Sequence, residues 1–178
     1  MGKRDVKNIT LGSGHFYLVP FTDTMPTVET VCVEENRLGF IKGGAALEYS
    51  EEPYEEKDDL GYVSKIITND EEALLKCGLI TWNGETLSKL IDRCTTKTEG
   101  GKRVTKIGGA GNAKGTYYAA CFAHVDGDLW VMVKGRNIAG ATLTFAKDEG
   151  TVVEPEFKAV PHDDAGTLVE IIETVATT

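Results

Sequence analysis

The chain has 178 residues, of which 19 are Lys or Arg and 28 are Asp or Glu, so its formal net charge is −9. A chain of this length buries roughly two-thirds of its unfolded surface, and we expect one domain over residues 1–178. The acidic balance argues against a surface that grips nucleic acid, because such binding depends on cations that neutralise phosphates. No segment approaches the roughly 18 apolar residues of a membrane span, so we expect a soluble protein made in a cytoplasm, with no membrane segment.

The N-terminal part is expected to contain short strands and one long loop. Residues 6–12 and 15–20 are typical of two strands around a turn at residues 12–14. Residues 21–35 are rich in threonine and lack a sustained period, which predicts an extended loop with a short strand at residues 31–33. Loops of this length are usually functional or disordered.

Residues 38–68 predict a long hairpin with an acidic tip. Its arms, residues 45–49 and 60–67, place Leu or aromatic side chains at every second position, which is the period of a strand. The connector, residues 50–59, holds six acidic residues against one lysine and is too charged to be buried in its own subunit. We therefore expect it to project into solvent or onto a partner. The candidate residues for contact with another subunit are Glu51, Glu52, Tyr54, Glu55, Glu56, Lys57, Asp58 and Asp59.

Residues 69–78 predict a short helix that flanks the sheet. Thr68 or Asn69 can cap its start, acidic residues follow in the first turn, and Gly78 can end it. Its apolar side, which includes Leu74, would pack on the sheet.

A tryptophan, a turn and a glycine-rich stretch follow this helix. Trp82 is expected in the core, residues 83–84 are expected to form a turn, and residues 85–91 are expected to add a helical turn or two. Residues 93–115 are rich in Thr, Lys and Gly, so we expect a loop that is mobile or is ordered by a partner.

The C-terminal part predicts the main strands of the sheet. Residues 116–125 and 128–134 flank Asp126-Gly127, a pair that favours a type I′ hairpin turn, and both arms are apolar on much of both faces. Three further strands are expected at residues 141–146, 152–160 and 167–175. The predicted fold is mainly β: an antiparallel β-sandwich or barrel with one flanking α-helix and a long protruding hairpin.

No residue set points to catalysis, a cofactor or a metal. Residues 108–116 resemble a phosphate loop, but the lysine is not followed by Ser or Thr and no helix is expected next. The acidic residues lie on one tip and lack the spacing of a calcium loop. Histidines and cysteines are scattered without metal-ligand or redox spacing, and we expect the thiols to be free and buried; these residues are His15, His124, His162, Cys32, Cys77, Cys94 and Cys121. We therefore predict that the protein is not an enzyme.

Several segments carry a resemblance to a known family through their order and spacing: GGAALEY, YEEKDDLGYVSK, NDEEALLKCGLITWNGETL and AKDEGTVVEPEFKA. From about residue 38 to 91, and again from 115 to 172, the chain resembles the tail tube (major tail) proteins of long-tailed bacteriophages and prophages. The resemblance covers roughly two-thirds of the chain.

The resemblance implies a structural virion protein. Such proteins form homo-hexameric rings that stack into the tail tube around a tape-measure protein, meet tail-tip and tail-terminator proteins, and later let double-stranded DNA pass. The expected location is the virion tail, and the host cytoplasm during assembly. An acidic subunit suits this role, because a negatively charged bore repels phosphates and lets DNA slide.

Two alternatives stay open. The first is an inner-tube protein of a contractile tail or of a related injection or secretion machine, which a neighbouring sheath gene would favour. The second is a monomeric ligand-binding β-barrel or an unrecognised hydrolase, which would show a pocket with convergent polar groups.

Overall fold

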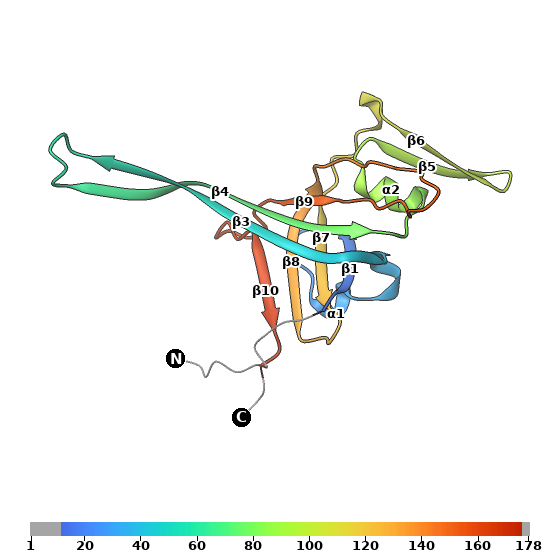
Figure 1. Ribbon diagram of the computed structural model, residues 1–178, viewed down its shortest axis with the longest axis horizontal. Coiled ribbons are helices and arrows are strands. Elements are labelled where there is room, and N and C mark those ends of the chain that lie inside the picture. Colours follow the sequence, from blue (N-terminus) through green and yellow to red (C-terminus); the bar gives the residue numbers. More distant parts are fainter. Residues whose placement is uncertain (1–11, 176–178) are drawn as a thin grey trace.

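The chain is mainly β, with antiparallel strands that form a sandwich and a long hairpin that projects from it (Figure 1). The computed structural model describes residues 12–175. The elements in chain order are β1 (Gly14–Pro20), α1 (Val28–Val31), the 3-10 turn η2 (Glu34–Asn36), β2 (Arg37–Gly39), β3 (Ile41–Lys57), β4 (Ser64–Leu79), α2 (Gly84–Leu90), β5 (Cys94–Glu99), β6 (Lys102–Ile107), the 3-10 turn η3 (Ala110–Asn112), β7 (Tyr118–His124), β8 (Leu129–Asn137), β9 (Glu156–Ala159) and β10 (Val169–Glu173).

β8 connects the layers of the sandwich. Its residues 129–133 pair with β10, whereas its residues 135–137 pair with β9, so the sheet divides along this strand. The strand order is β2-β1-β7-β8-β9-β4-β3, with β10 beside β8, while β5 and β6 form a separate sheet of their own. In Figure 1, β3, β4 and β9 run across β7, β8 and β10. The two groups of strands therefore enclose a common core.

The core is built from side chains of both layers. Phe16 of β1 and Phe157 of β9 are fully buried, and their rings stack with centroids 5.5 Å apart. Leu75 of β4 and Val133 of β8 belong to the same cluster. Trp82, expected in the core, is partly buried and packs at its margin. Burial of large apolar side chains of this kind is the main favourable term in folding.

β4 replaces the helix predicted over residues 69–78, and that prediction is wrong. The side chains of β4 alternate between the core and the outer face, and the buried ones are Ala73, Leu75, Cys77 and Leu79. One edge of β4 pairs with β3 and the other with β9, so partners far away in the sequence satisfy its backbone. This non-local pairing outweighs the local helix signals, since intrinsic propensity is only a weak preference.

The residues predicted as helix boundaries have other roles. Thr68 lies opposite Pro53 in the ladder between β3 and β4, and Asn69 is the extra residue of a bulge at the same place. Gly78 allows a close approach of the two strands, because a Cβ atom there would lie 2.6 Å from the carbonyl oxygen of Lys42.

The flanking helix of the structure is α2. Asn83 caps it, since its Oδ1 accepts hydrogen bonds from the backbone N–H groups of Glu85 at 2.8 Å and Thr86 at 3.0 Å. Residues 83–84, predicted as a turn, therefore belong to the start of this helix. The helical turns expected over residues 85–91 are confirmed.

Residues 93–115 form a hairpin and a short 3-10 turn, so the prediction of a loop is wrong. β5 and β6 pair along their whole length. Gly100 and Gly101 join them with φ values of 57° and 74°, and a type I′ turn requires positive values at both central positions. The Thr-rich and Lys-rich composition therefore belongs to an exposed two-stranded sheet.

Most of the other predicted strands are confirmed. Residues 15–20, 116–125, 128–134 and 167–175 correspond to β1, β7, β8 and β10. The strand predicted over residues 152–160 is confirmed as β9 and as an isolated bridge between Val153 and Leu79.

Three smaller predictions need correction. Residues 141–146, all of them described, form no strand, and residues 31–33 lie at the end of α1 instead of in a strand. The turn at residues 126–127 is present, but only Gly127 has a positive φ, 68°, so it is not a type I′ turn. The strand predicted over residues 6–12 lies outside the described residues, apart from its last position.

Candidate assembly surface

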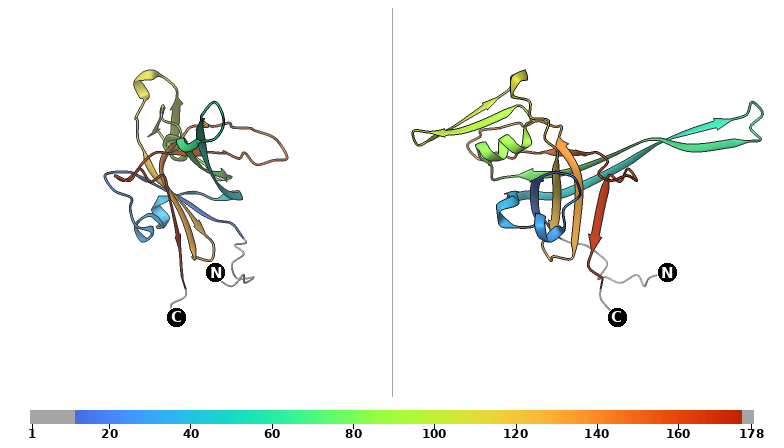
Figure 2. Two further views of the ribbon diagram at one scale, coloured as in Figure 1. Left: turned by 90° about the vertical axis from the view of Figure 1, so that its left-hand side faces the viewer. Right: turned by 180° about the vertical axis from the view of Figure 1, so that it is seen from behind.

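The hairpin of β3 and β4 reaches far beyond the sandwich, as Figure 1 and the right-hand view of Figure 2 show. Its proximal half belongs to the main sheet, where Leu47 lies opposite Leu75 and β9 continues the ladder. From Glu48 to Glu71, every residue of both strands and of the turn is exposed. The distal half therefore contributes nothing to the core of its own chain.

The tip of the hairpin is a turn over residues 58–63. β3 continues to Lys57, so residues 50–57, predicted as part of the connector, are strand instead. Asp58 closes the turn, because its carboxylate accepts a hydrogen bond from the backbone N–H of Val63 at 2.7 Å. The acidic composition suggested a loop, whereas an exposed strand tolerates the same charges because its side chains reach water.

All the predicted contact residues lie on this exposed distal half. Those on β3 are Glu51, Glu52, Tyr54, Glu55, Glu56 and Lys57, and those in the turn are Asp58 and Asp59. The structure therefore brings them together on one projection, as their charge predicted, although on a strand more than on a loop; their contact with another subunit stays a prediction.

Like charges face each other across the hairpin. Glu51 lies opposite Glu71, and Glu52 lies opposite Asp70. Directly opposed like charges destabilise a strand pair. The hydroxyl of Tyr49 lies 2.8 Å from Glu71 Oε2 and 2.9 Å from Glu51 Oε1, so it can donate its proton to either carboxylate. These hydrogen bonds, the one to Glu71 first, raise the pKa of Tyr49 above its ordinary value.

The hairpin also concentrates the charge of the chain. Between Glu48 and Glu72 there are ten acidic and two basic residues, while the whole chain has a formal net charge of −9. The hairpin therefore carries most of the net charge. Within its distal half the ion pair is that of Lys57 with Glu55, at 3.1 Å, so most of its carboxylates face water.

Large apolar and aromatic side chains are exposed on the same projection. Tyr62 is 84% exposed and Leu60 is 76% exposed. The full set of such side chains is Tyr49, Tyr54, Leu60, Tyr62, Val63, Ile66 and Ile67. So many exposed large apolar side chains on one projection favour a role in protein–protein contact. Of this set only Tyr54 was predicted as a contact residue, because the alternation in residues 60–67 was interpreted as an arm that belongs to the sheet.

A hollow of about 500 Å³ lies at the root of the hairpin, between β3 and β4 on one side and β10 on the other. Leu47, Leu168 and Ile171 supply apolar walls, and Tyr49 and Glu71 reach its edge. The Tyr49 hydroxyl already bonds to Glu71, so these polar groups serve each other and do not converge on a ligand.

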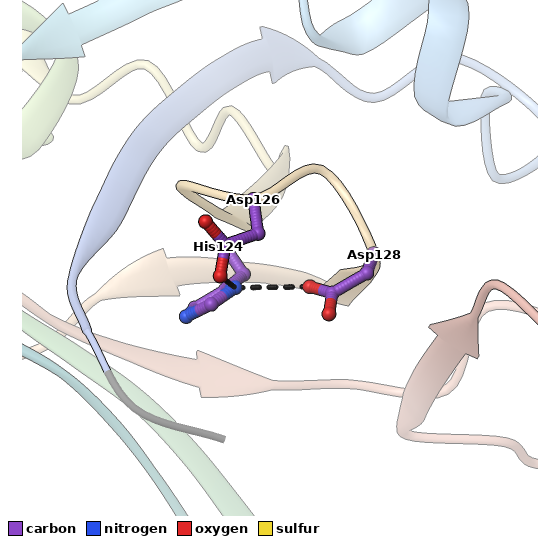
Figure 3. Close-up of side chains that lie close together, drawn as sticks. All are labelled: His124, Asp126 and Asp128. Atoms are coloured by element: carbon purple, nitrogen blue, oxygen red, sulfur yellow. Dashed lines mark hydrogen bonds and ion pairs between the residues drawn. The ribbon is translucent and has the colours of Figure 1, made fainter. Parts of the chain in front are cut away.

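One cluster of metal-type ligands lies on the turn between β7 and β8 (Figure 3). The ligand atoms of His124, Asp126 and Asp128 lie within 4.8 Å of one another. His124 is buried and its Nδ1 is 2.9 Å from Asp128 Oδ1, whereas both aspartates are exposed. The same residues hold the turn, since Gly127 N–H donates to the carbonyl of His124 at 3.0 Å. These contacts stabilise the turn between β7 and β8; a structural or surface role of His124 stays a prediction.

The loop that resembles a phosphate-binding loop is engaged with its own chain. Lys114 Nζ donates to the backbone carbonyl of Ser88 at 2.6 Å and to its hydroxyl at 2.9 Å. The backbone N–H of Gly115 donates to the carboxylate of Asp92 at 2.7 Å. These hydrogen bonds fix the segment before β7 against Ser88 of α2 and against Asp92.

No protein-family model matches the chain, and no curated protein matches it. Within residues 12–175, none of the helices has the length and apolar character needed to cross a bilayer.

Proposed function

We propose that the protein is a tail tube subunit, which assembles as homo-hexameric rings that stack into the hollow tail of a long-tailed phage. In this role it is a structural virion component and not an enzyme. Its partners are further copies of itself, a tape-measure protein inside the tube, and tail-tip and tail-terminator proteins at its ends. Double-stranded DNA passes through the finished tube without being gripped.

The β3–β4 hairpin is the observation that carries the proposal. Its distal half projects from the sandwich, is exposed on both strands, and combines apolar side chains with opposed carboxylates such as Glu51 and Glu71. None of these features stabilises the isolated subunit. A contact surface provided by another copy would bury the apolar side chains and separate or neutralise the charges.

The free edges of the main sheet support assembly as well. Among the described residues, the strand order ends at β2 on one side and at β3 on the other, so each of these strands has an edge without a strand partner. Free edges promote uncontrolled pairing, and natural proteins cover or charge them. A closed ring of identical subunits would cover both edges, because head-to-tail contacts repeat until the rotation closes.

The decisive experiment removes the projection without touching the sandwich. Ser50 lies opposite Glu72, so residues 51–71 can be replaced by Asn-Gly, which favours a tight hairpin turn. All of the removed residues are exposed, and we therefore expect a folded chain with an unchanged melting temperature, whose circular dichroism spectrum loses only the signal of the removed strand residues.

Assembly is measured by negative-stain electron microscopy and light-scattering mass over a concentration series. The full-length chain is expected to form hollow rings or tubes, and the shortened chain is expected to stay a folded monomer. Tubes of normal length from the shortened chain would refute the role of the hairpin. A full-length chain that remains monomeric even with added tail-tip proteins would refute the proposed function itself.

A further inference from the structure

A second hairpin, formed by β5 and β6, projects from the end of the molecule opposite to the β3–β4 hairpin (Figure 1, and the right-hand view of Figure 2). One face of it packs on α2. On this inner face, Thr96 and Thr105 lie opposite each other and approach Gly84, and Arg103 forms an ion pair of 2.7 Å with Glu85. Within residues 12–175, no element covers the other face, and its side chains are exposed.

This outer face is basic with an apolar centre. The ladder places Lys97 opposite Val104, Lys106 opposite Thr95, and Lys102 opposite Glu99. Successive side chains of a strand alternate between faces, so all six residues share the face that turns away from α2. Val104 is 47% exposed at the centre of the group. We call this surface the basic face; it consists of Thr95, Lys97, Glu99, Lys102, Val104 and Lys106.

The basic face is hollowed and largely unneutralised. A concavity of about 460 Å³ is lined by Lys97, Val104 and Lys106, together with Thr95, Glu99 and Asn112. Lys97 lies 3.7 Å from Glu99, and both side chains stay mostly in water. Among residues 12–175, Lys102 and Lys106 form no ion pair. The face therefore offers positive charge around an apolar concavity.

We propose that the basic face is the docking surface for the β3–β4 hairpin of a second copy of this chain. This proposal rests on the proposed function, because the second copy is taken to be the next subunit of the same tube. It goes further by naming the surface that receives the hairpin.

Charge complementarity selects this occupant. Residues 48–72 contain ten acidic and two basic residues, whereas the basic face has three lysines and one glutamate. Complementary potentials of this kind guide association and fix the register of a contact. Docking would place cations beside the opposed pairs of Glu51 with Glu71 and of Glu52 with Asp70, and would relieve their repulsion.

The geometry restricts the contact to separate copies. The two hairpins extend in opposite directions from one body, so a single chain cannot bring them together (Figure 1). A contact between different surfaces of identical subunits is heterologous, and such a contact repeats from copy to copy to give rings or filaments. The two hairpins thus provide a donor and an acceptor at opposite ends, as a polymerising subunit needs.

Matched charge reversals test the proposal. The first variant combines Lys97→Glu, Lys102→Glu and Lys106→Glu on the basic face. The second combines Glu52→Lys, Glu56→Lys and Asp59→Lys on the β3–β4 hairpin. All six side chains are exposed, so both variants are expected to fold as the parent does, which circular dichroism and melting temperature check.

Each variant alone is expected to lose tube formation, because the first makes the basic face net negative beside an acidic hairpin, and the second makes the outer part of the hairpin, residues 51–67, net positive beside a basic face. Mixing the two variants is expected to restore tubes, since copies of the first can alternate with copies of the second. A single chain with all six reversals is expected to assemble as well. Tube formation by the parent should also weaken as salt shortens the screening length from about 10 Å at 0.1 M to about 3 Å at 1 M.

The outcomes separate this inference from the proposed function. Two folded variants that fail alone and fail in the mixture would overturn the docking contact. Normal tubes from the first variant would also overturn the docking contact and would leave the proposed tube role intact. Binding of duplex DNA by the parent chain that is lost in this variant would then assign the three lysines to DNA instead. A parent chain that forms neither rings nor tubes would overturn both proposals.

Discussion

Replacement of Leu75 by alanine should destabilise the protein strongly. Leu75 is 1% exposed and lies between Leu47 of β3 and Phe157 of β9. A leucine-to-alanine change at a fully buried site costs about 2–5 kcal/mol, through lost burial and the cavity that remains. We expect a loss of about 3 kcal/mol, which for a domain of this size lowers the melting temperature by about 6–12 °C.

The matched control is Leu74→Ala. Leu74 is only partly buried and lies on the outer face of β4, opposite Glu48 and Lys158, so we expect a loss of about 1 kcal/mol. Both variants are measured by urea unfolding followed by circular dichroism and tryptophan fluorescence. In a helix over residues 69–78, Leu74 would join the buried side. A loss at Leu74 equal to or greater than that at Leu75 would therefore refute the assignment of β4 as a strand.

Three further predictions concern single sites. Tyr49→Phe should speed amide exchange in the distal hairpin and leave the melting temperature unchanged. Hydrogen bonds to carboxylates raise the pKa of Tyr49, so the stabilising contact is complete below pH 10 and is lost as the pH rises through the folded-state pKa. Tyrosinate absorbance of the parent and of the variant would follow this loss. Near neutral pH, alkylation should modify Cys32 before Cys77, as mass spectrometry would detect. A hydrogen bond from a neighbouring thiol lowers the pKa of Cys32, whereas burial raises the pKa of Cys77 to about 12. Earlier modification of Cys77 would contradict this order. Gly78→Ala should cost about 1–3 kcal/mol in denaturant unfolding, since its Cβ would meet the carbonyl oxygen of Lys42, and an unchanged stability would show that the strands can separate there.

The strands that the sequence predicts well carry their signal within a short segment. β1, β7 and β8 consist of apolar runs bounded by Gly-rich or Asp-Gly turns, and α2 begins at Asn83, whose side chain caps it. In these cases the local preference and the final fold agree, so a reading of neighbouring residues is sufficient.

β4 shows where such a reading fails. The segment from Asn69 to Gly78 has a capping residue, acidic side chains and a terminal glycine, all of which favour a helix. Its conformation is decided by β3 and β9, which supply hydrogen bonds on both edges and buried partners such as Phe157. That information is spread over more than eighty residues of sequence, so no local pattern can contain it.

The candidate surface was predicted in part for the same reason. Charge alone identified Glu51 to Asp59 as a projection, because a dense acidic segment cannot be buried in its own subunit. The exposed Tyr62 and Ile66 were missed, since alternation gives the period of a strand but does not tell whether anything covers its faces. The basic face was missed because its Thr-rich and Lys-rich composition is shared by loops and by exposed strands.

The buried core and the charged hairpin lie in different parts of the chain. The buried core lies in the sandwich, whereas residues 48–71 are exposed throughout and most of the net charge lies between Glu48 and Glu72. Changes in the hairpin are therefore expected to leave the stability of the body unaltered. In the proposed assembly, the acidic hairpins of two copies repel each other, whereas each hairpin is attracted to the basic face of another copy. Because every copy carries both surfaces, this charge pattern favours a head-to-tail contact over a contact between two like surfaces.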